Sequence, residues 1–169
     1  VRSLLNLARG GQTEAVTEVA LPQVVHDVVE LLGHEGKKNN VTFVDQTKGL
    51  GTCVLANNGA LHQVVLNLFV NSIHAIEAAQ KAGRIDNHKI TIEVAESPGR
   101  ATLSISDTGC GISKENIKHL FKPFFTTKDV GVGTGLGLAT SYRIVQGWGG
   151  DIRVESQQGV GTKFHIILP

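Results

Sequence analysis

The chain has 169 residues, of which 41% are hydrophobic and 18% charged, and its formal net charge is +1. These values suit one globular domain with a hydrophobic core, and the scattered basic residues exclude the clustered basic surface of a nucleic-acid-binding domain. No apolar run is long enough to span a bilayer. The two cysteines, Cys53 and Cys110, form no CxxC pair, which argues against a zinc site and favours a reducing compartment. The sequence contains no methionine, so we expect a fragment of a longer protein.

The first part of the chain predicts a helix end followed by strands and a helix. Residues 1–8 place apolar side chains on one helical stripe, and Gly10 and Gly11 follow where helices end. We interpret residues 1–10 as the end of a longer helix or a linker, and 11–169 as one domain. A helix is expected to begin near Pro22. Strands are expected over residues 13–20, 41–45 and 52–56.

The rest of the chain predicts further helices and two hairpins. The longest helix should follow Asn57 and Asn58, both good N-cap residues. The expected helices cover residues 60–81, 113–120 and 138–146. Alternating apolar residues predict hairpins, with strands over residues 89–95, 101–106, 152–156 and 162–168. This order of elements indicates an α+β fold, with a mixed sheet covered by helices on one face.

Two amides stand out on the longest predicted helix. Asn67 and Asn71 lie at i and i+4 and therefore share one helical face. A buried face rarely carries two amides unless they meet a partner, and an amide carbonyl is a suitable oxygen ligand for Mg²⁺ held together with phosphate. Two surface asparagines would explain this pair alone equally well.

A carboxylate follows the strand over 101–106. Asp107 at a strand end can accept a hydrogen bond from an adenine amine, and Gly109 and Gly111 would let the backbone approach a flat base. Taken alone, this DxGxG pattern is also typical of ordinary turns.

Two further motifs lie between residues 121 and 137. Residues 121–128, FKPFFTTK, combine three phenylalanines with two lysines; they would either plug a loop into the core or anchor a mobile lid whose lysines lie near phosphate. Residues 131–137, GVGTGLG, precede a helix, so their backbone N–H groups and the helix N-terminus would favour an anion. No Gly-Lys-Ser/Thr follows, which excludes a Walker A loop.

These four motifs, in this order and spacing, resemble the catalytic domain of bacterial two-component sensor histidine kinases. The match extends through Gly150-x-Ile152-x-Val154-x-Ser156 to the final residues 159–169. The resemblance implies a two-layer α/β sandwich that binds Mg-ATP under a mobile lid. It also implies transfer of the γ-phosphoryl group to a histidine on a separate dimerisation domain.

The resemblance assigns roles to individual residues. It implies that Asn71 holds magnesium, that Asn67 supports the metal or the phosphates, and that Asp107 fixes the adenine amine. His74 stands where some relatives carry a lysine and would contact phosphate, although an exposed helix histidine is the alternative. The other implied nucleotide-contacting residues line the base, seat the lid, meet the phosphates or form the pocket floor: Gly109, Gly111, Ile112, Phe121, Lys122, Phe124, Phe125, Thr126, Thr127, Lys128, Gly133, Thr134, Gly135, Leu136, Gly137, Leu138 and Thr162.

The residue type at position 67 distinguishes a kinase from a hydrolase. Gyrase-type ATPases, heat-shock chaperones and MutL proteins share this pocket but carry a water-activating glutamate at that position. Asparagine is no base, and phosphoryl transfer needs mainly alignment and charge neutralisation, so Asn67 favours a kinase. A non-catalytic nucleotide-sensing or anti-sigma-type module is a second alternative, against which the complete motif at 121–128 argues.

The phosphoacceptor histidine is expected outside the chain. His34 is followed by the acidic residue Glu35, but Gly36 comes next, no proline is near, and it sits at a helix end. We therefore expect the acceptor upstream of Val1, on dimerisation helices that end within residues 1–10, and little turnover by the fragment alone. The expected partners are these helices, in a homodimeric parent, and a response regulator. We expect a cytoplasmic domain with no nucleic-acid partner and no direct membrane contact.

Overall fold

The computed structural model describes residues 15–85, 87–127 and 133–169. The predicted helix over residues 1–8 lies outside them, as does Lys128. The described chain folds into seven strands and four helices, in this order: β1 (Thr17–Ala20), α2 (Leu21–Lys38), β2 (Val41–Asp45), β3 (Cys53–Ala56), α3 (Asn58–Lys81), β4 (His88–Ser97), β5 (Arg100–Asp107), α4 (Lys114–Ile117), α5 (Gly137–Gly147), β6 (Asp151–Gln157) and β7 (Gly161–Leu168).

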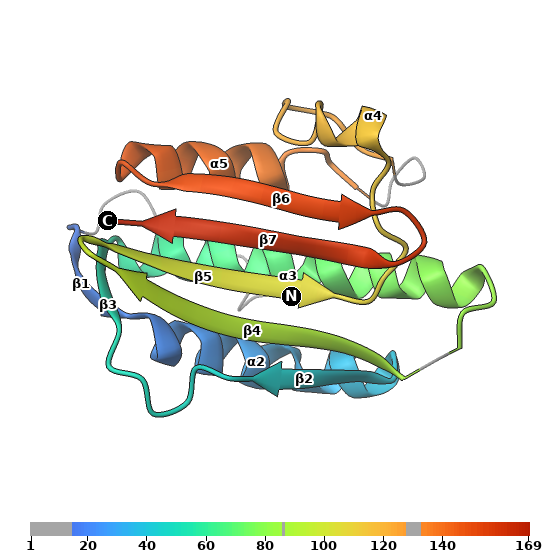
Figure 1. The fold of residues 1–169 in the computed structure, drawn as a ribbon, viewed down its shortest axis with the longest axis horizontal. Coiled ribbons are helices and arrows are strands. Elements are labelled where there is room, and N and C mark those ends of the chain that lie inside the picture. Colours follow the sequence, from blue (N-terminus) through green and yellow to red (C-terminus); the bar gives the residue numbers. More distant parts are fainter. Residues whose placement is uncertain (1–14, 86, 128–132) are drawn as a thin grey trace.

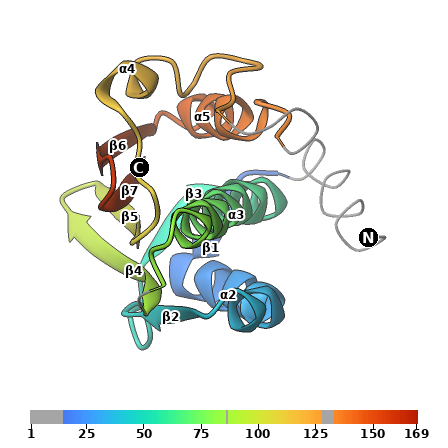
Figure 2. The ribbon, with the colours of Figure 1, turned by 90° about the vertical axis from the view of Figure 1, so that its right-hand side faces the viewer.

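The main sheet is mixed, as the sequence predicts. Its strand order is β2-β4-β5-β7-β6, with β2 and β4 parallel and the other neighbours antiparallel. β1 and β3 form a separate antiparallel pair. Helices α2, α3 and α5 lie together on one side of the five-stranded sheet, and its other face is open (Figures 1 and 2). The α+β prediction with helices on one face is therefore confirmed.

The core lies between this sheet and α3. Side chains of α3 at helical spacing, among them Leu61, Leu68 and Ile76, are fully buried. They meet the inward-facing residues of β5, where Leu103 and Ile105 are likewise buried. Because side chains alternate along a strand, Asp107 faces the same inward side at the end of β5.

The open face of the sheet carries polar side chains that satisfy one another. Ser104 on β5 lies 2.9 Å from Nδ1 of His165 on β7, whose Nε2 lies 3.2 Å from a Glu155 carboxylate oxygen. Lys163 pairs with Glu93 at 2.9 Å. This alternation of apolar and polar faces explains why the sheet is covered on one side only.

The largest differences from the predicted helix boundaries are in α3 and α4. The Asn57 side chain accepts a hydrogen bond from the Ala60 backbone N–H at 2.8 Å, so α3 begins at Asn58, two residues earlier than expected. Ser113 caps α4 as predicted, but α4 ends at Ile117 because the following residues form turns, such as the bond from Lys122 N to His119 O. No helix within the described residues is long and apolar enough to cross a membrane.

Candidate functional site

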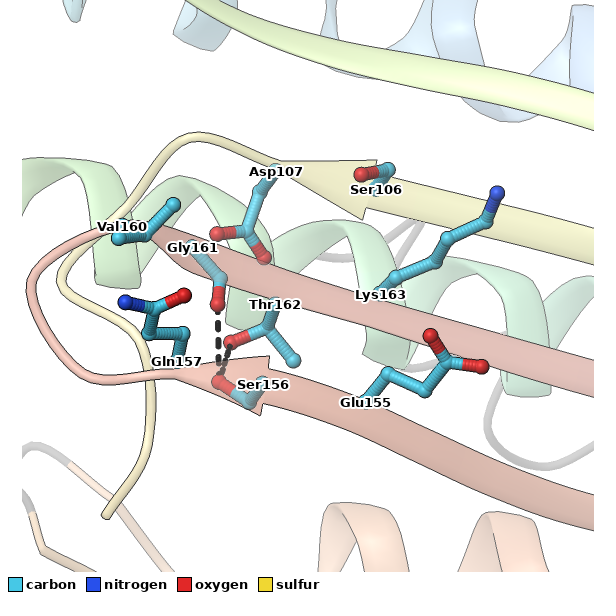
Figure 3. Close-up of a pocket in the computed structure, with 9 residues that line it drawn as sticks. All are labelled: Ser106, Asp107, Glu155, Ser156, Gln157, Val160, Gly161, Thr162 and Lys163. Atoms are coloured by element: carbon cyan, nitrogen blue, oxygen red, sulfur yellow. Dashed lines mark hydrogen bonds between the residues drawn. The ribbon is translucent and has the colours of Figure 1, made fainter.

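The candidate site lies where β5 ends and β7 begins. Asp107 on β5 pairs with Thr162 on β7, and the two side chains are only 5% and 4% exposed. Figure 3 shows them around a hollow at this end of the sheet, beside Ser156 of β6. The hollow is lined by Ser106, Asp107, Glu155, Ser156, Gln157, Val160, Gly161, Thr162 and Lys163. The sequence therefore predicts correctly that Thr162 is near Asp107.

Hydrogen bonds fix the floor of this hollow. Ser156 Oγ lies 2.9 Å from both the Gly161 carbonyl and Thr162 Oγ1, and it accepts the Ile112 backbone N–H at 2.8 Å. The carbonyl of Gly161 can only accept, so Ser156 donates to it and accepts from Thr162. The Thr162 hydroxyl is thus left with its lone pairs, and can accept a further hydrogen bond.

Asp107 is the most perturbed acid of the site. Burial raises the pKa of its carboxyl group to about 6, although the Gly109 backbone, the Ser72 hydroxyl, the Thr162 backbone and the charge of His88 each lower it. The Gly109 N–H donates to Oδ1 at 2.9 Å. Because burial outweighs these donors, the carboxylate is an acceptor suited to the N–H group of a ligand.

Ser72 is a site residue that sequence reasoning missed. It follows Asn71 on α3, is 1% exposed, and its hydroxyl lowers the Asp107 pKa, which places it near that carboxylate. Yet no atom of the described residues stands in proper hydrogen-bonding geometry to Ser72 Oγ. An unsatisfied buried hydroxyl costs about 1–3 kcal/mol, so it calls for a ligand or a bound water.

Arg84 in the α3–β4 connection and His88, the first residue of β4, contact the turn that follows Asp107. Arg84 donates to the carbonyls of Gly109 at 2.9 Å and Thr108 at 3.2 Å. The buried ring of His88 lies 3.1 Å from the Thr108 carbonyl and 3.0 Å from the Arg84 carbonyl. These two residues, separated from the turn by about twenty positions, were not foreseen from the sequence. They fix the backbone whose first residue is Asp107.

Two glycines of this turn are required by packing. A Cβ on Gly109 would lie 2.6 Å from the Ala75 carbonyl carbon on α3. Gly111 has φ +67 and a Cβ there would overlap the Gln157 carbonyl oxygen. The glycines predicted to line a base thus also let the turn fit between α3 and the β6–β7 connection.

Asn67 connects α3 to α5. Its side-chain nitrogen donates to the Gly137 carbonyl at 3.3 Å and to Ser141 Oγ at 3.1 Å. Asn71 and His74 lie one and two turns further along the same helix and are half-buried. The α3 face therefore extends from the first residue of α5, Gly137, toward Asp107. An N-terminus of an eleven-residue helix favours an anion.

The phenylalanines of residues 121–128 divide into packed and exposed side chains. Phe121 stacks on Tyr142 of α5 with ring centroids 4.7 Å apart, and Phe125 lies against His119 at 5.7 Å. Phe124 is 75% exposed, and its backbone N–H donates to the Gly135 carbonyl at 2.9 Å. The segment is thus anchored on α5 and on the glycine-rich segment, with one aromatic side chain left in solvent.

The other predicted site residues are placed as follows. Ile112 and Leu138 are half-buried and pack against the core, and Gly133 and Gly135 are also half-buried. Exposed positions are Lys122, Thr126, Thr127, Thr134 and Leu136. Of the predicted mobile lid, residues 129–134, the first four lie outside the described residues.

Comparison with known proteins gives one family. Residues 56–169 match the family model described as "Histidine kinase-, DNA gyrase B-, and HSP90-like ATPase". The signal transduction histidine-protein kinase AtoS of Escherichia coli (strain K12) is 36% identical over 170 residues, which cover 100% of this chain and 26% of AtoS. The chain thus spans about a quarter of this relative.

Solved structures agree with the sequence match. The catalytic domain of histidine kinase ThkA superposes with a TM-score of 0.76 and 32% identity, covering 91% of this chain and 95% of that one. A second ThkA structure, in complex with the response regulator protein TrrA, has a TM-score of 0.70 and 26% identity, covering 91% of this chain and 41% of the ThkA chain.

Proposed function

Because the chain belongs to the histidine kinase-, DNA gyrase B- and HSP90-like ATPase family, we propose that residues 11–169 form the ATP-binding catalytic domain of a sensor histidine kinase. It transfers the γ-phosphoryl group of Mg-ATP to a histidine on a separate dimerisation domain. The observation that carries this proposal is the buried Asp107 carboxylate beside the unsatisfied Ser72 hydroxyl, at the end of the helix face that bears Asn67 and Asn71.

The adenine base is proposed to bind at Asp107. An exocyclic amine donates a hydrogen bond, and a carboxylate whose burial raises its pKa to about 6 gains most from accepting it. The Ser72 hydroxyl, which meets no described atom in good hydrogen-bonding geometry, and the Thr162 hydroxyl would hold a ring nitrogen or a bridging water.

Magnesium is proposed to be held by amide oxygens of α3 together with the phosphates. Among residues 15–85, 87–127 and 133–169, no three His, Cys, Asp or Glu side chains come close enough to hold a metal ion. Mg²⁺ commonly takes one or two protein ligands plus phosphate oxygens and waters, which fits a donor set of Asn71 supported by Asn67. Bound there, the ion would neutralise charge on the phosphates, while the N-terminus of α5 would favour them from the other side.

Transfer to histidine is favoured over hydrolysis by Asn67. Its amide donates to α5 through both of its contacts there, to Gly137 and Ser141, and an amide takes no proton from water at neutral pH. Such a pocket aligns ATP but leaves it intact until a nucleophile such as an imidazole nitrogen arrives.

The proposed partners lie outside the chain. The relative AtoS is about four times as long as the matched region, and ThkA has been solved with a response regulator. We therefore propose that residues 1–10 lead from dimerisation helices carrying the acceptor histidine, in a homodimeric parent that passes its phosphoryl group to a response regulator. Because ATP is the proposed substrate, the domain is placed in the cytoplasm.

The test combines calorimetry with phosphohistidine analysis. The fragment should bind ADP with magnesium, release almost no phosphate from ATP alone, and label a histidine of the parent's upstream helices. The label should be acid-labile and base-stable. Asn71→Ala should abolish the label, whereas Asn58→Ala, an exposed asparagine at the start of the same helix, should not. Steady phosphate release without a labelled histidine would contradict the kinase proposal and indicate a hydrolase.

A further inference from the structure

We infer that Ser141 is a positioning residue that fixes which end of the Asn67 amide faces the nucleotide. The inference rests on the proposed function and adds a specific role for a hydroxyl on α5. Ser141 is 0% exposed, and its Oγ receives the Asn67 side-chain nitrogen at 3.1 Å.

The two contacts of Asn67 determine its orientation. The Gly137 carbonyl, 3.3 Å from the side-chain nitrogen, can only accept a hydrogen bond. The nitrogen must therefore face α5, and the Ser141 hydroxyl accepts its second N–H. Both donors of the amide are then used by α5, and Oδ1 accepts no hydrogen bond from any described residue.

This orientation decides what the amide offers to the site. An asparagine side chain has nearly the same shape when its oxygen and nitrogen exchange places, so packing alone does not choose between them. The oxygen is a ligand or support for Mg²⁺, whereas the NH₂ group would repel a cation. Without the Ser141 hydroxyl, only the longer 3.3 Å contact to Gly137 would hold the amide.

The experiment separates orientation from packing by measuring the magnesium dependence of nucleotide binding. ADP affinity is determined by calorimetry with excess magnesium and again with EDTA, and the ratio of the two affinities is the magnesium gain. Ser141→Ala should reduce this gain by about fivefold, as expected for loss of one hydrogen bond, and should leave the EDTA affinity unchanged. In an Asn67→Ala background, Ser141→Ala should have no further effect on the gain.

Ser104→Ala is the matched control. Ser104 is a buried serine whose hydroxyl contacts the His165 side chain, but it lies on the open face of the sheet. Its replacement should leave the magnesium gain unchanged. If Ser141→Ala fails to fold by circular dichroism, Ser141→Cys keeps a side chain of similar size with a much weaker hydrogen-bonding group, and should reduce the gain in the same way.

Several outcomes would overturn the inference. Equal losses of affinity in magnesium and in EDTA would make Ser141 a packing residue only. An unchanged gain in the folded variant would overturn it alone, provided that Asn71→Ala removes the gain. No gain in the wild-type domain would overturn both this inference and the metal site of the proposed function.

Discussion

Replacing Asp107 by asparagine should make the domain more stable and at the same time unable to bind nucleotide tightly. The carboxyl group is 5% exposed, and its burial raises the pKa from the ordinary 3.8 to about 6. That difference corresponds to about 3 kcal/mol. The amide carries no charge to desolvate, its oxygen can still accept the Gly109 N–H, and its nitrogen can donate to Ser72 Oγ.

The sign of the pH dependence follows from linkage. The native state holds the Asp107 proton more tightly than the unfolded state, so this group favours folding below pH 4. That contribution is lost as the pH rises from about 4 to about 6. Above pH 6 Asp107 is ionised, and the full free-energy cost of its raised pKa destabilises the folded wild type. Asp107→Asn should therefore gain at most about 3 kcal/mol at pH 7.5, and the advantage should vanish near pH 4.

Two assays check this reasoning. Urea unfolding can be followed by the fluorescence of the single tryptophan, Trp148, which packs against the core beside α5. ADP affinity should fall at least tenfold, because a charge-assisted hydrogen bond is worth about 1.5–3 kcal/mol. A variant that is less stable than wild type at pH 7.5, or a stability difference that does not change with pH, would refute the electrostatic account. Unchanged ADP affinity would remove Asp107 from the adenine site.

The remaining predictions concern the same end of the sheet. ADP binding should weaken as the pH falls through about 6, because the adenine base needs the ionised Asp107, and binding near that pH should release protons. Calorimetry in buffers of different ionisation enthalpy measures the released protons, and an affinity that does not change with pH would contradict the prediction. Arg84→Ala should weaken ADP binding several-fold by freeing the turn that Arg84 clamps, Arg84→Lys should restore part of the loss, and the exposed Arg153→Ala should leave affinity unchanged. Gly111→Ala should lower the free energy of unfolding by more than the roughly 1–2 kcal/mol cost of a left-handed residue. Gly99→Ala, at φ +72 with open space around it, should lower it by that cost only. Equal urea midpoints for the two variants would show that the overlap with Gln157 is relieved.

Much of the fold could be predicted because it depends on local patterns. Alternation along residues 101–106 predicts β5, and extending it by one residue puts Asp107 on the inward side. The motif around Thr162 predicts its place near Asp107, which the β5–β7 register confirms. The predicted start of α3 lies two residues too far along the chain. Asn57 and Asn58 are both suitable N-caps, and because Asn57 is the one that caps the helix, α3 begins at Asn58.

Residues that act through distant contacts could not be predicted. Ser72 occupies a position that helical spacing assigns to the core, and nothing in the spacing says that its hydroxyl will face Asp107. Arg84 follows a helix end in a polar loop, where a solvated side chain is the usual outcome. Ser141 looks like an ordinary helix serine until Asn67, 74 positions earlier, is brought against it. Each of these roles exists only after the helices have packed.

The contrast between two polar groups of side chains explains why the ligand site is assigned to one of them. Ser104, His165 and Glu155 on the open face form a chain of hydrogen bonds in which each group meets a partner. Serine, histidine and glutamate in this order could suggest a hydrolase, but β5 and β7 pair with each other along these residues, and an oxyanion hole would need backbone or side-chain donors aimed at one point. Asp107 and Ser72 differ, because the carboxylate carries a desolvation cost and the hydroxyl meets no described atom in good hydrogen-bonding geometry. The fold alone gives no reason to keep two such groups, since asparagine and alanine would fit there at lower cost. A ligand that donates to the carboxylate and hydrogen-bonds to the hydroxyl lowers both costs. Because it binds only the folded state, it also stabilises the domain against unfolding.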